Sequence, residues 1–204
     1  MVRWVGASFL AFALLGAWLS GAAERALARR EATWGVTLRH GDLVFQDLDC
    51  GLRCALIRRV TRSRYSHVGV VVDAAGERVV WEALHDVAPV PLSEWVGRGR
   101  GRRVAAYRPD HVPPDLRARL AAMAGRPYDG DYQWDDARIY CSELVAKAWD
   151  VVLAEPHAVD LGSDAARIAA MTGGRLTSRT LLVSPADLVR SGRTTRLVDE
   201  LSAP

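Results

Sequence analysis

Lysine is nearly missing from the sequence, since Lys147 is the single lysine among 27 lysine and arginine residues. The arginines are spread along the chain apart from one short run, RGRGRR, at residues 98–103, and the formal net charge is only +3. Proteins that bind nucleic acids usually carry a basic stripe or a much larger positive charge. We therefore expect no nucleic-acid partner.

Cysteine is also scarce, with three residues in a chain of 204. Cys50 and Cys54 stand close together in DCGLRC, and Cys141 stands alone. In an oxidising compartment the first two could form a disulfide, although a C-x3-C bridge is geometrically demanding inside a helix. The sequence equally allows an unpaired pair or a metal or redox role. Because only His40 is at all close to them in sequence, we predict no metal and no organic cofactor.

Charged residues are absent from residues 4–23, WVGASFLAFALLGAWLSGAA, which follow Arg3. The run has roughly the 20-residue length of a membrane-spanning helix, and the small residues at its end suit signal-peptide cleavage. We predict that residues 1–23 are a signal peptide or a membrane anchor, with a buried helix as the alternative. No cysteine follows directly, which argues against a lipoprotein-type anchor. Both predictions favour an extracytoplasmic location in the cell envelope.

The rest of the chain is expected to be a linker, residues 24–36, and one domain, residues 37–204. Alternating valines predict strands, and apolar residues at helical spacing predict helices. The expected strands are 41–47, 66–73, 77–84 and 102–109, and the expected helices are 52–62, 113–125, 141–153, 163–171 and 184–191. Because most strands precede most helices, we predict an α+β fold with an antiparallel sheet.

Cys141 is expected at the N-terminus of a helix, in the stretch ARIYCSELVAKAW. Unpaired backbone N–H groups and the helix dipole favour a thiolate there, and the same N–H groups suit an oxyanion. The alternative is an inert cysteine in the core, because cysteine is among the most buried residue types.

A nucleophilic cysteine needs a histidine base, and His67 is the one histidine of five within a confident strand. If residues 73–76 form a four-residue turn, His67 lies directly opposite Glu82 of the next strand. A carboxylate among apolar neighbours is costly unless it is paired. We therefore expect Glu82 to hold the imidazole, although a one-residue slip would move it to the other face.

Six motifs between residues 38 and 190 resemble, in this order, the permuted NlpC-type papain-like cysteine hydrolases, and the YiiX/YebB-like branch matches best: HGDLVF, SRYSHVGVVV, VVWEAL, GRPYD, YCSELV and VSPADL. In ordinary papain-like enzymes the cysteine precedes the histidine. In the permuted branch the order is reversed, as it is here. The resemblance implies a circularly permuted papain-like fold.

The resemblance also implies roles for individual residues. Cys141 would be the nucleophile, His67 its base and Glu82 the residue that orients the histidine. We expect three further residues to contribute to substrate binding: Tyr128, Tyr140 and Ser66.

The implied activity is that of a thiol hydrolase that cleaves an amide bond through a thioester acyl-enzyme. Family analogy favours peptide substrates derived from the cell wall. One alternative is a lipid acyl hydrolase or acyltransferase on the same scaffold, with membrane association through residues 4–23. Another is a non-catalytic envelope-binding module, which an unreactive Cys141 would support.

Overall fold

The computed structural model describes residues 21–201, and the chain divides into two units after Thr37. In the first unit, residues 21–34 are helical, so most of the expected linker is a helix. Residues 4–20 of the uncharged run lie outside the described residues, and the signal peptide or membrane anchor stays a prediction. Within residues 21–201 we find no helical stretch whose length and hydrophobicity would suit a bilayer crossing.

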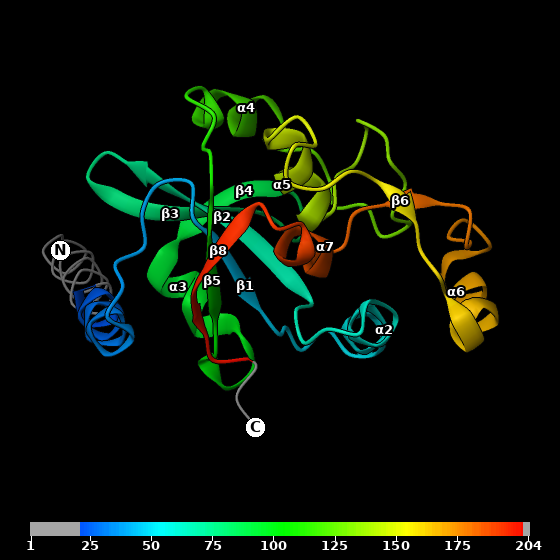
Figure 1. The fold of residues 1–204 in the computed structure, drawn as a ribbon, viewed down its shortest axis with the longest axis horizontal. Helices are drawn as coiled ribbons and strands as arrows, with labels where there is room; N and C mark the ends of the chain where they lie inside the picture. Colours follow the sequence, from blue (N-terminus) through cyan, green and yellow to red (C-terminus); the bar gives the residue numbers. More distant parts are fainter. Residues whose placement is uncertain (1–20, 202–204) are drawn as a thin grey trace, which may run out of the picture. The chain divides into compact units, whose positions relative to one another are not determined.

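The second unit, described for residues 38–201, is built on a six-stranded antiparallel sheet (Figure 1). The strand order is β4-β3-β2-β1-β5-β8. The strands are β1 (Leu43–Gln46), β2 (His67–Ala74), β3 (Glu77–Ala83), β4 (Val87–Pro91), β5 (Ala105–Pro109) and β8 (Thr194–Asp199). A separate ribbon pairs β6 (His157–Ala158) with β7 (Leu181–Leu182). The antiparallel sheet with its helices confirms the α+β prediction.

The helices of this unit cover both faces of the sheet. They are α2 (Leu52–Thr61), α3 (Leu92–Arg98), α4 (Leu116–Ala122), α5 (Cys141–Ala148), α6 (Ala165–Thr172) and α7 (Pro185–Arg190), with single 3-10 turns at η1 (Arg100–Arg102) and η2 (Gly162–Asp164). The main core joins alternate residues of β1 and β2, such as Phe45 and Val70, to Leu120 of α4, Leu144 of α5 and Leu188 of α7.

A smaller apolar cluster lies beside the main core and includes Tyr140, Leu161, Ile168 and Leu182. Leu56 of α2 packs against it. This cluster brings α2, η2, α6 and the β6–β7 ribbon together beside the start of α5. The first residue of α5 therefore lies where the two cores meet.

Two predicted helices are shorter than expected. Helix α4 begins at Leu116 and not at residue 113, and α5 ends at Ala148 and not at residue 153. Asp150 and Val151 adopt the left-handed region, with φ of 49° and 57°, which no α-helix can continue through.

Several elements were not predicted from the sequence, namely α3, β4, β8 and the two short strands β6 and β7. Pro89 and Pro91 argue against a strand at residues 87–91, because proline cannot donate a backbone hydrogen bond. The strand forms because β4 lies at the edge of the sheet, where proline is tolerated. Strand β8, at the opposite edge of the sheet, was not predicted because most of its residues are polar.

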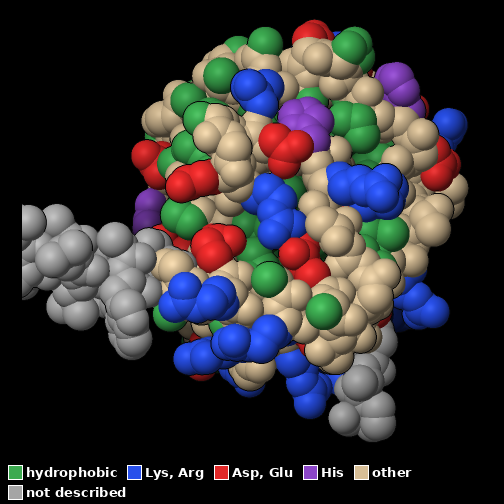
Figure 2. Space-filling model, turned by 90° about the vertical axis from the view of Figure 1, so that its left-hand side faces the viewer, with side chains coloured by type: hydrophobic (Ala, Val, Ile, Leu, Met, Phe, Trp, Pro, Cys, Tyr) green, Lys and Arg blue, Asp and Glu red, His purple; other side chains and the backbone are tan. Residues whose placement is uncertain are grey.

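On the face drawn in Figure 2, acidic side chains lie between the basic ones. Within the RGRGRR run, Arg98 pairs with Glu82 and Arg100 with Asp49.

Candidate active site

Helix α5 places Cys141 at its first position. Tyr140 precedes it in an extended conformation, and the Tyr140 N–H donates to Glu143 Oε2 at 3.2 Å, which closes the first turn. Cys141 is a free thiol, 4% exposed. Because the first N–H groups of a helix have no partners within the helix, this end favours a negative charge on the sulfur or on a bound oxygen.

The register of the β2–β3 hairpin differs from the predicted one. The structure pairs Ala74 with Glu77, so that only Ala75 and Gly76 remain as the turn. Both have positive φ, 50° and 87°, as a two-residue hairpin turn of type I′ requires. His67 is therefore not directly opposite Glu82, and this prediction was wrong by two residues.

A shift of two residues preserves the face of the strand, so Glu82 still lies on the His67 side. The observed register, continued by one pair beyond Val70 and Trp81, sets Glu82 opposite Gly69. The carboxylate reaches the ring diagonally: His67 Nε2 and Glu82 Oε2 are 2.6 Å apart, with both side chains buried. The predicted pair thus forms through a geometry other than the predicted one.

Gly69 has no side chain, which leaves room for the Trp95 ring beside the His67 ring. A Cβ at this position would lie 2.3 Å from a methyl carbon of Val80 and 3.4 Å from Trp95 Nε1. The Trp95 ring of α3 stacks on the His67 ring, with centroids 6.2 Å apart and planes at 25°. A side chain at Gly69 would disturb this packing.

Arg98, at the end of α3, holds the second oxygen of Glu82. Its guanidinium donates to Glu82 Oε1 at 2.5 Å. Burial by itself would raise the pKa of Glu82, but hydrogen bonds and charge from His67 and Arg98 bring that pKa below its ordinary value. Sequence reasoning missed Arg98 because it stands in a run of arginines and comes from an unpredicted helix.

His67 is held between two acidic groups. Glu82 occupies Nε2, and the thiol of Cys141 also acts on the ring. Burial by itself lowers the pKa of His67, but the hydrogen bonds to Cys141 and Glu82 and their negative charge raise it to about 9. The site therefore favours the protonated imidazole at neutral pH.

Tyrosines surround the thiol. Burial raises the pKa of Tyr128 well above its usual range, with further contributions from Tyr132 and Cys141. Burial likewise raises the pKa of Tyr132 to about 12. These phenols remain neutral hydrogen-bond donors at any physiological pH. Tyr140 has a different position, because its hydroxyl accepts the N–H of Val183 at 3.1 Å and so supports the wall of the site.

Ser66 lies directly before His67 and is hydrogen-bonded within the protein. Its side chain is buried, and its hydroxyl accepts the Leu48 N–H at 2.8 Å and lies 3.4 Å from Asp47 Oδ1. These bonds hold the chain that enters β2. Ser66 therefore helps to position the strand that carries His67, and its expected role in substrate binding stays a prediction.

The single lysine, Lys147, lies on α5 and contacts side chains of the same helix and of the loop before it. Lys147 Nζ lies 2.8 Å from Glu143 Oε1, 2.8 Å from Asp136 Oδ1 and 5.2 Å from the centre of the Trp134 ring. It fixes the 134–136 loop against α5. Burial outweighs the pull of Lys147 and raises the pKa of Glu143 to about 7.

Cys50 and Cys54 form a disulfide, with their Cα atoms 5.2 Å apart. The bridge is feasible because α2 begins at Leu52, so Cys50 lies outside the helix. Of the alternatives that the sequence left open, the structure shows the disulfide. Within residues 21–201, no three histidine, cysteine, aspartate or glutamate side chains are grouped as metal ligands.

The chain is similar to known proteins in sequence and in fold. Residues 37–198 match a family described as permuted papain-like amidase enzymes, YaeF/YiiX. The uncharacterized protein YiiX of Escherichia coli K12 is 32% identical over 118 residues, which are 55% of this chain and 58% of that protein. A crystal structure described as metalloprotein YiiX from Escherichia coli O157:H7 matches with a TM-score of 0.73 and 26% identity, over 79% of this chain and 97% of that chain.

Proposed function

Because the chain belongs to the permuted papain-like amidases of the YaeF/YiiX family, we propose that Cys141, His67 and Glu82 are its catalytic triad. Family membership makes the protein a cysteine amidase or hydrolase in general, and the roles of these residues are our proposal. One observation carries it: Nε2 of the buried His67 lies 2.6 Å from Glu82, and the same ring is near enough to the free thiol of Cys141 for that thiol to raise its pKa.

Acylation starts from the pair in which His67 already holds the proton of the Cys141 thiol. The thiolate attacks the carbonyl carbon of an amide, a bond forms between sulfur and carbon, and negative charge moves to the carbonyl oxygen. Backbone N–H groups at the start of α5 stabilise that oxyanion, and neutral Tyr128 is a further donor. His67 then gives its proton to the nitrogen, the carbon–nitrogen bond breaks, and the amine leaves.

Deacylation uses the same groups in reverse. His67 takes a proton from water, and the resulting hydroxide attacks the thioester carbon. The carbon–sulfur bond breaks, a carboxylic acid leaves, and the proton returns to the cysteine. Glu82, fixed by Arg98, keeps the imidazole oriented and stabilises its charged form throughout.

The natural substrate and the location are also proposals. A cell-wall peptide outside the cytoplasm fits the expected signal peptide or anchor, and the Cys50–Cys54 disulfide supports an oxidising compartment. If residues 1–23 are retained, they would bring the enzyme to a membrane surface. An apolar pocket lies beside Cys141 and is lined in part by Leu56 of α2 and by Ile168 and Met171 of α6.

The test is amine release from simple acyl amides and from muropeptides by the full-length protein. We expect Cys141→Ala and His67→Ala each to lose at least about a thousandfold in kcat/KM. His85→Ala is the matched control, because that histidine side chain is exposed at the end of β3. Mass spectrometry of acid-quenched wild type should find the acyl group on the Cys141 peptide. Full activity of Cys141→Ala would refute the assignment.

A further inference from the structure

Tyr132 lies in the wall of the pocket that contains the Cys141 thiol, whereas Tyr128 is not among the lining residues of that pocket. The Tyr132 hydroxyl is buried, and within residues 21–201 it has no hydrogen-bond partner of ordinary geometry. A buried hydroxyl without a partner costs free energy, because it has lost its hydrogen bonds to water. Such a group is unusual in a folded protein and calls for an explanation.

The backbone at Tyr132 is strained. Its φ is 57°, in the left-handed region that bulky residues rarely adopt. The fully buried Asp129 fixes the residues on both sides: its carboxylate accepts the Asp131 N–H at 2.9 Å and also the Gln133 N–H. Arg138 pairs in turn with Asp129 at 3.3 Å and with Asp131 at 3.0 Å. Backbone strain of this kind clusters where it positions a functional group.

The ring of Tyr132 is held beside the start of α5. It meets the ring of Tyr140, the residue before Cys141, edge-on, with centroids 5.5 Å apart and planes at 60°. Burial is the main cause that raises the pKa of Tyr132 to about 12, and negative charge at Cys141 acts in the same direction. The phenol is therefore near enough to the sulfur to feel its charge, and it remains a neutral donor at physiological pH.

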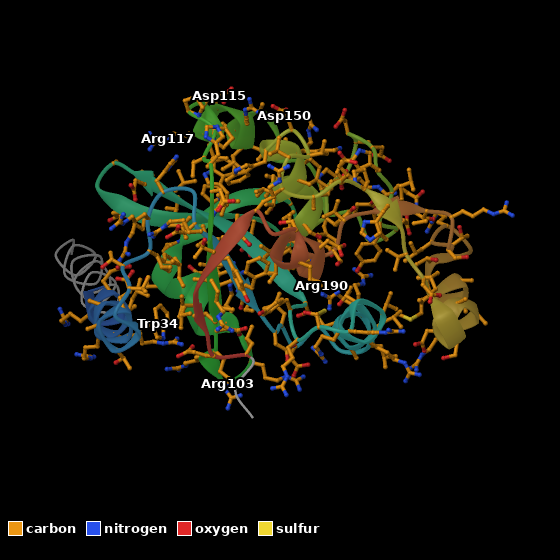
Figure 3. The ribbon with its side chains drawn as sticks, viewed as in Figure 1. Trp34, Arg103, Asp115, Arg117, Asp150 and Arg190 are labelled. Carbon is orange, nitrogen blue, oxygen red and sulfur yellow. A yellow bond between two sulfur atoms is a disulfide. The ribbon has the colours of Figure 1, made fainter. Side chains whose placement is uncertain are left out.

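Helix α2 closes the pocket on another side. Arg53 lies over the backbone of the Tyr132 loop, since a Cβ at Gly130 would be 3.4 Å from a guanidinium nitrogen of Arg53. At the other end of α2, Arg190 of α7, labelled in Figure 3, donates to the carbonyls of Thr61 and Arg62 at 3.0 and 3.1 Å. The surroundings of the hydroxyl are thus preformed, as stabilisation of an oxyanion requires.

We propose that Tyr132 is a further catalytic residue, whose hydroxyl donates a hydrogen bond to the carbonyl oxygen of the acyl group that Cys141 attacks. As the sulfur–carbon bond forms, an electron pair of the carbonyl moves to its oxygen, and the phenol stabilises that charge while it keeps its own proton. Backbone N–H groups at the start of α5 are the other donors. This inference rests on the proposed function, because it adds a donor to the same acylation step.

The test is the acylation of Cys141 by p-nitrophenyl acetate, followed as the burst of p-nitrophenol from the full-length protein. The ester forms the same oxyanion as an amide but requires no amidase activity, and Cys141→Ala gives the background rate. In Tyr132→Phe the maximal acylation rate should fall about a hundredfold, as for loss of one oxyanion donor, with the half-saturating ester concentration unchanged. A loss smaller than about threefold would overturn the proposal.

Two controls show whether the effect belongs to the oxyanion. Tyr107→Phe removes another hydroxyl, which lies 2.9 Å from that of Tyr65 and outside the pocket lining, and it should be acylated as fast as the wild type. Iodoacetamide alkylates Cys141 with loss of iodide and forms no oxyanion, so Tyr132→Phe should be alkylated at the wild-type rate. If alkylation slows as much as acylation, Tyr132 acts on the thiol or on folding, and the proposal is overturned.

Amide hydrolysis separates this inference from the proposed function. If Tyr132→Phe loses ester acylation but the wild type hydrolyses no amide, the Tyr132 donor is supported and the proposed reaction is refuted. If the wild type and Tyr132→Phe hydrolyse amides equally fast through Cys141, the proposed reaction stands and the Tyr132 donor is overturned. A wild-type Cys141 that is neither acylated nor alkylated would overturn both.

Discussion

The substitution Glu82→Gln tests the coupling on which the candidate site depends. Glutamine keeps the size of the side chain and one oxygen acceptor but removes the charge beside His67. In the wild type, the pKa of the fully buried His67 is raised from 6.5 to about 9. Since one pKa unit corresponds to about 1.4 kcal/mol, the charged imidazole is stabilised by about 3 kcal/mol in total.

Cys141 and Glu82 share that stabilisation, because both raise the pKa of His67. If Glu82 supplies roughly half, its neutralisation lowers the pKa of His67 by about one unit or slightly more, within the ordinary effect of one opposite charge. The sign is fixed, because removal of a negative charge always disfavours the imidazolium. We therefore expect the variant to keep a protonated His67 only up to about pH 8.

The assay is the pH dependence of kcat/KM between pH 5 and 10 on one acyl amide. In the proposed mechanism a protonated His67 gives its proton to the leaving amine, so wild-type activity should fall as pH rises through about 9. In Glu82→Gln this fall should begin at least one pH unit lower, with reduced activity at the optimum. Glu77→Gln, on an exposed position of the same strand, should follow the wild type. An unshifted alkaline limb in Glu82→Gln would refute the reasoning.

Three further predictions concern the surroundings of the triad. Arg98→Met removes a charged hydrogen bond from Glu82 that is worth about 1.5–3 kcal/mol. We expect this variant to lower kcat/KM about tenfold and Arg98→Lys to restore part of the loss. An unchanged kcat/KM in Arg98→Met would contradict the positioning role of Arg98. Opening the five-residue Cys50–Cys54 loop should lower the free energy of unfolding by about 2 kcal/mol in urea titrations, and no change would speak against that disulfide. Because the pKa of Glu143 is raised from 4.5 to about 7 in the folded state, stability should fall more steeply between pH 5 and 7 in the wild type than in Glu143→Gln. The fall that the raised pKa of His67 causes above pH 6.5 is shared by both proteins, and parallel curves between pH 5 and 7 contradict the prediction.

Local signals in the sequence were enough to identify the elements that carry the site. The alternation in SHVGVVVD gave β2, and the apolar spacing after Cys141 gave α5. The face shared by His67 and Glu82 also followed, because strand faces depend only on odd or even spacing. The register of the hairpin could not be predicted in the same way. It depends on whether Asp73 and Ala74 belong to the strand or to the turn, and the sequence DAAG allows both backbone conformations.

Features that join distant segments were beyond the sequence alone. Arg98 reaches Glu82 only because the proline-containing β4 pairs at the sheet edge and sets the position of α3. The pocket similarly needs α2 and α6 to meet beside α5, which no local pattern in either helix specifies. The disulfide depends on the residue at which α2 begins. In each case the deciding quantity is a tertiary contact.

The central claim is that His67 activates Cys141, and the alkylation rate of Cys141 tests it most directly. Cys141 is the free cysteine of the chain, so iodoacetamide labelling followed by peptide mass spectrometry reports on it alone. At pH 6.5 only about 1% of an ordinary thiol is thiolate. We predict that wild-type Cys141 reacts at least about tenfold faster than a free thiol at this pH, and that His67→Ala abolishes the advantage. An inert Cys141, or equal rates in the two proteins, would contradict the triad and favour a non-catalytic binding module.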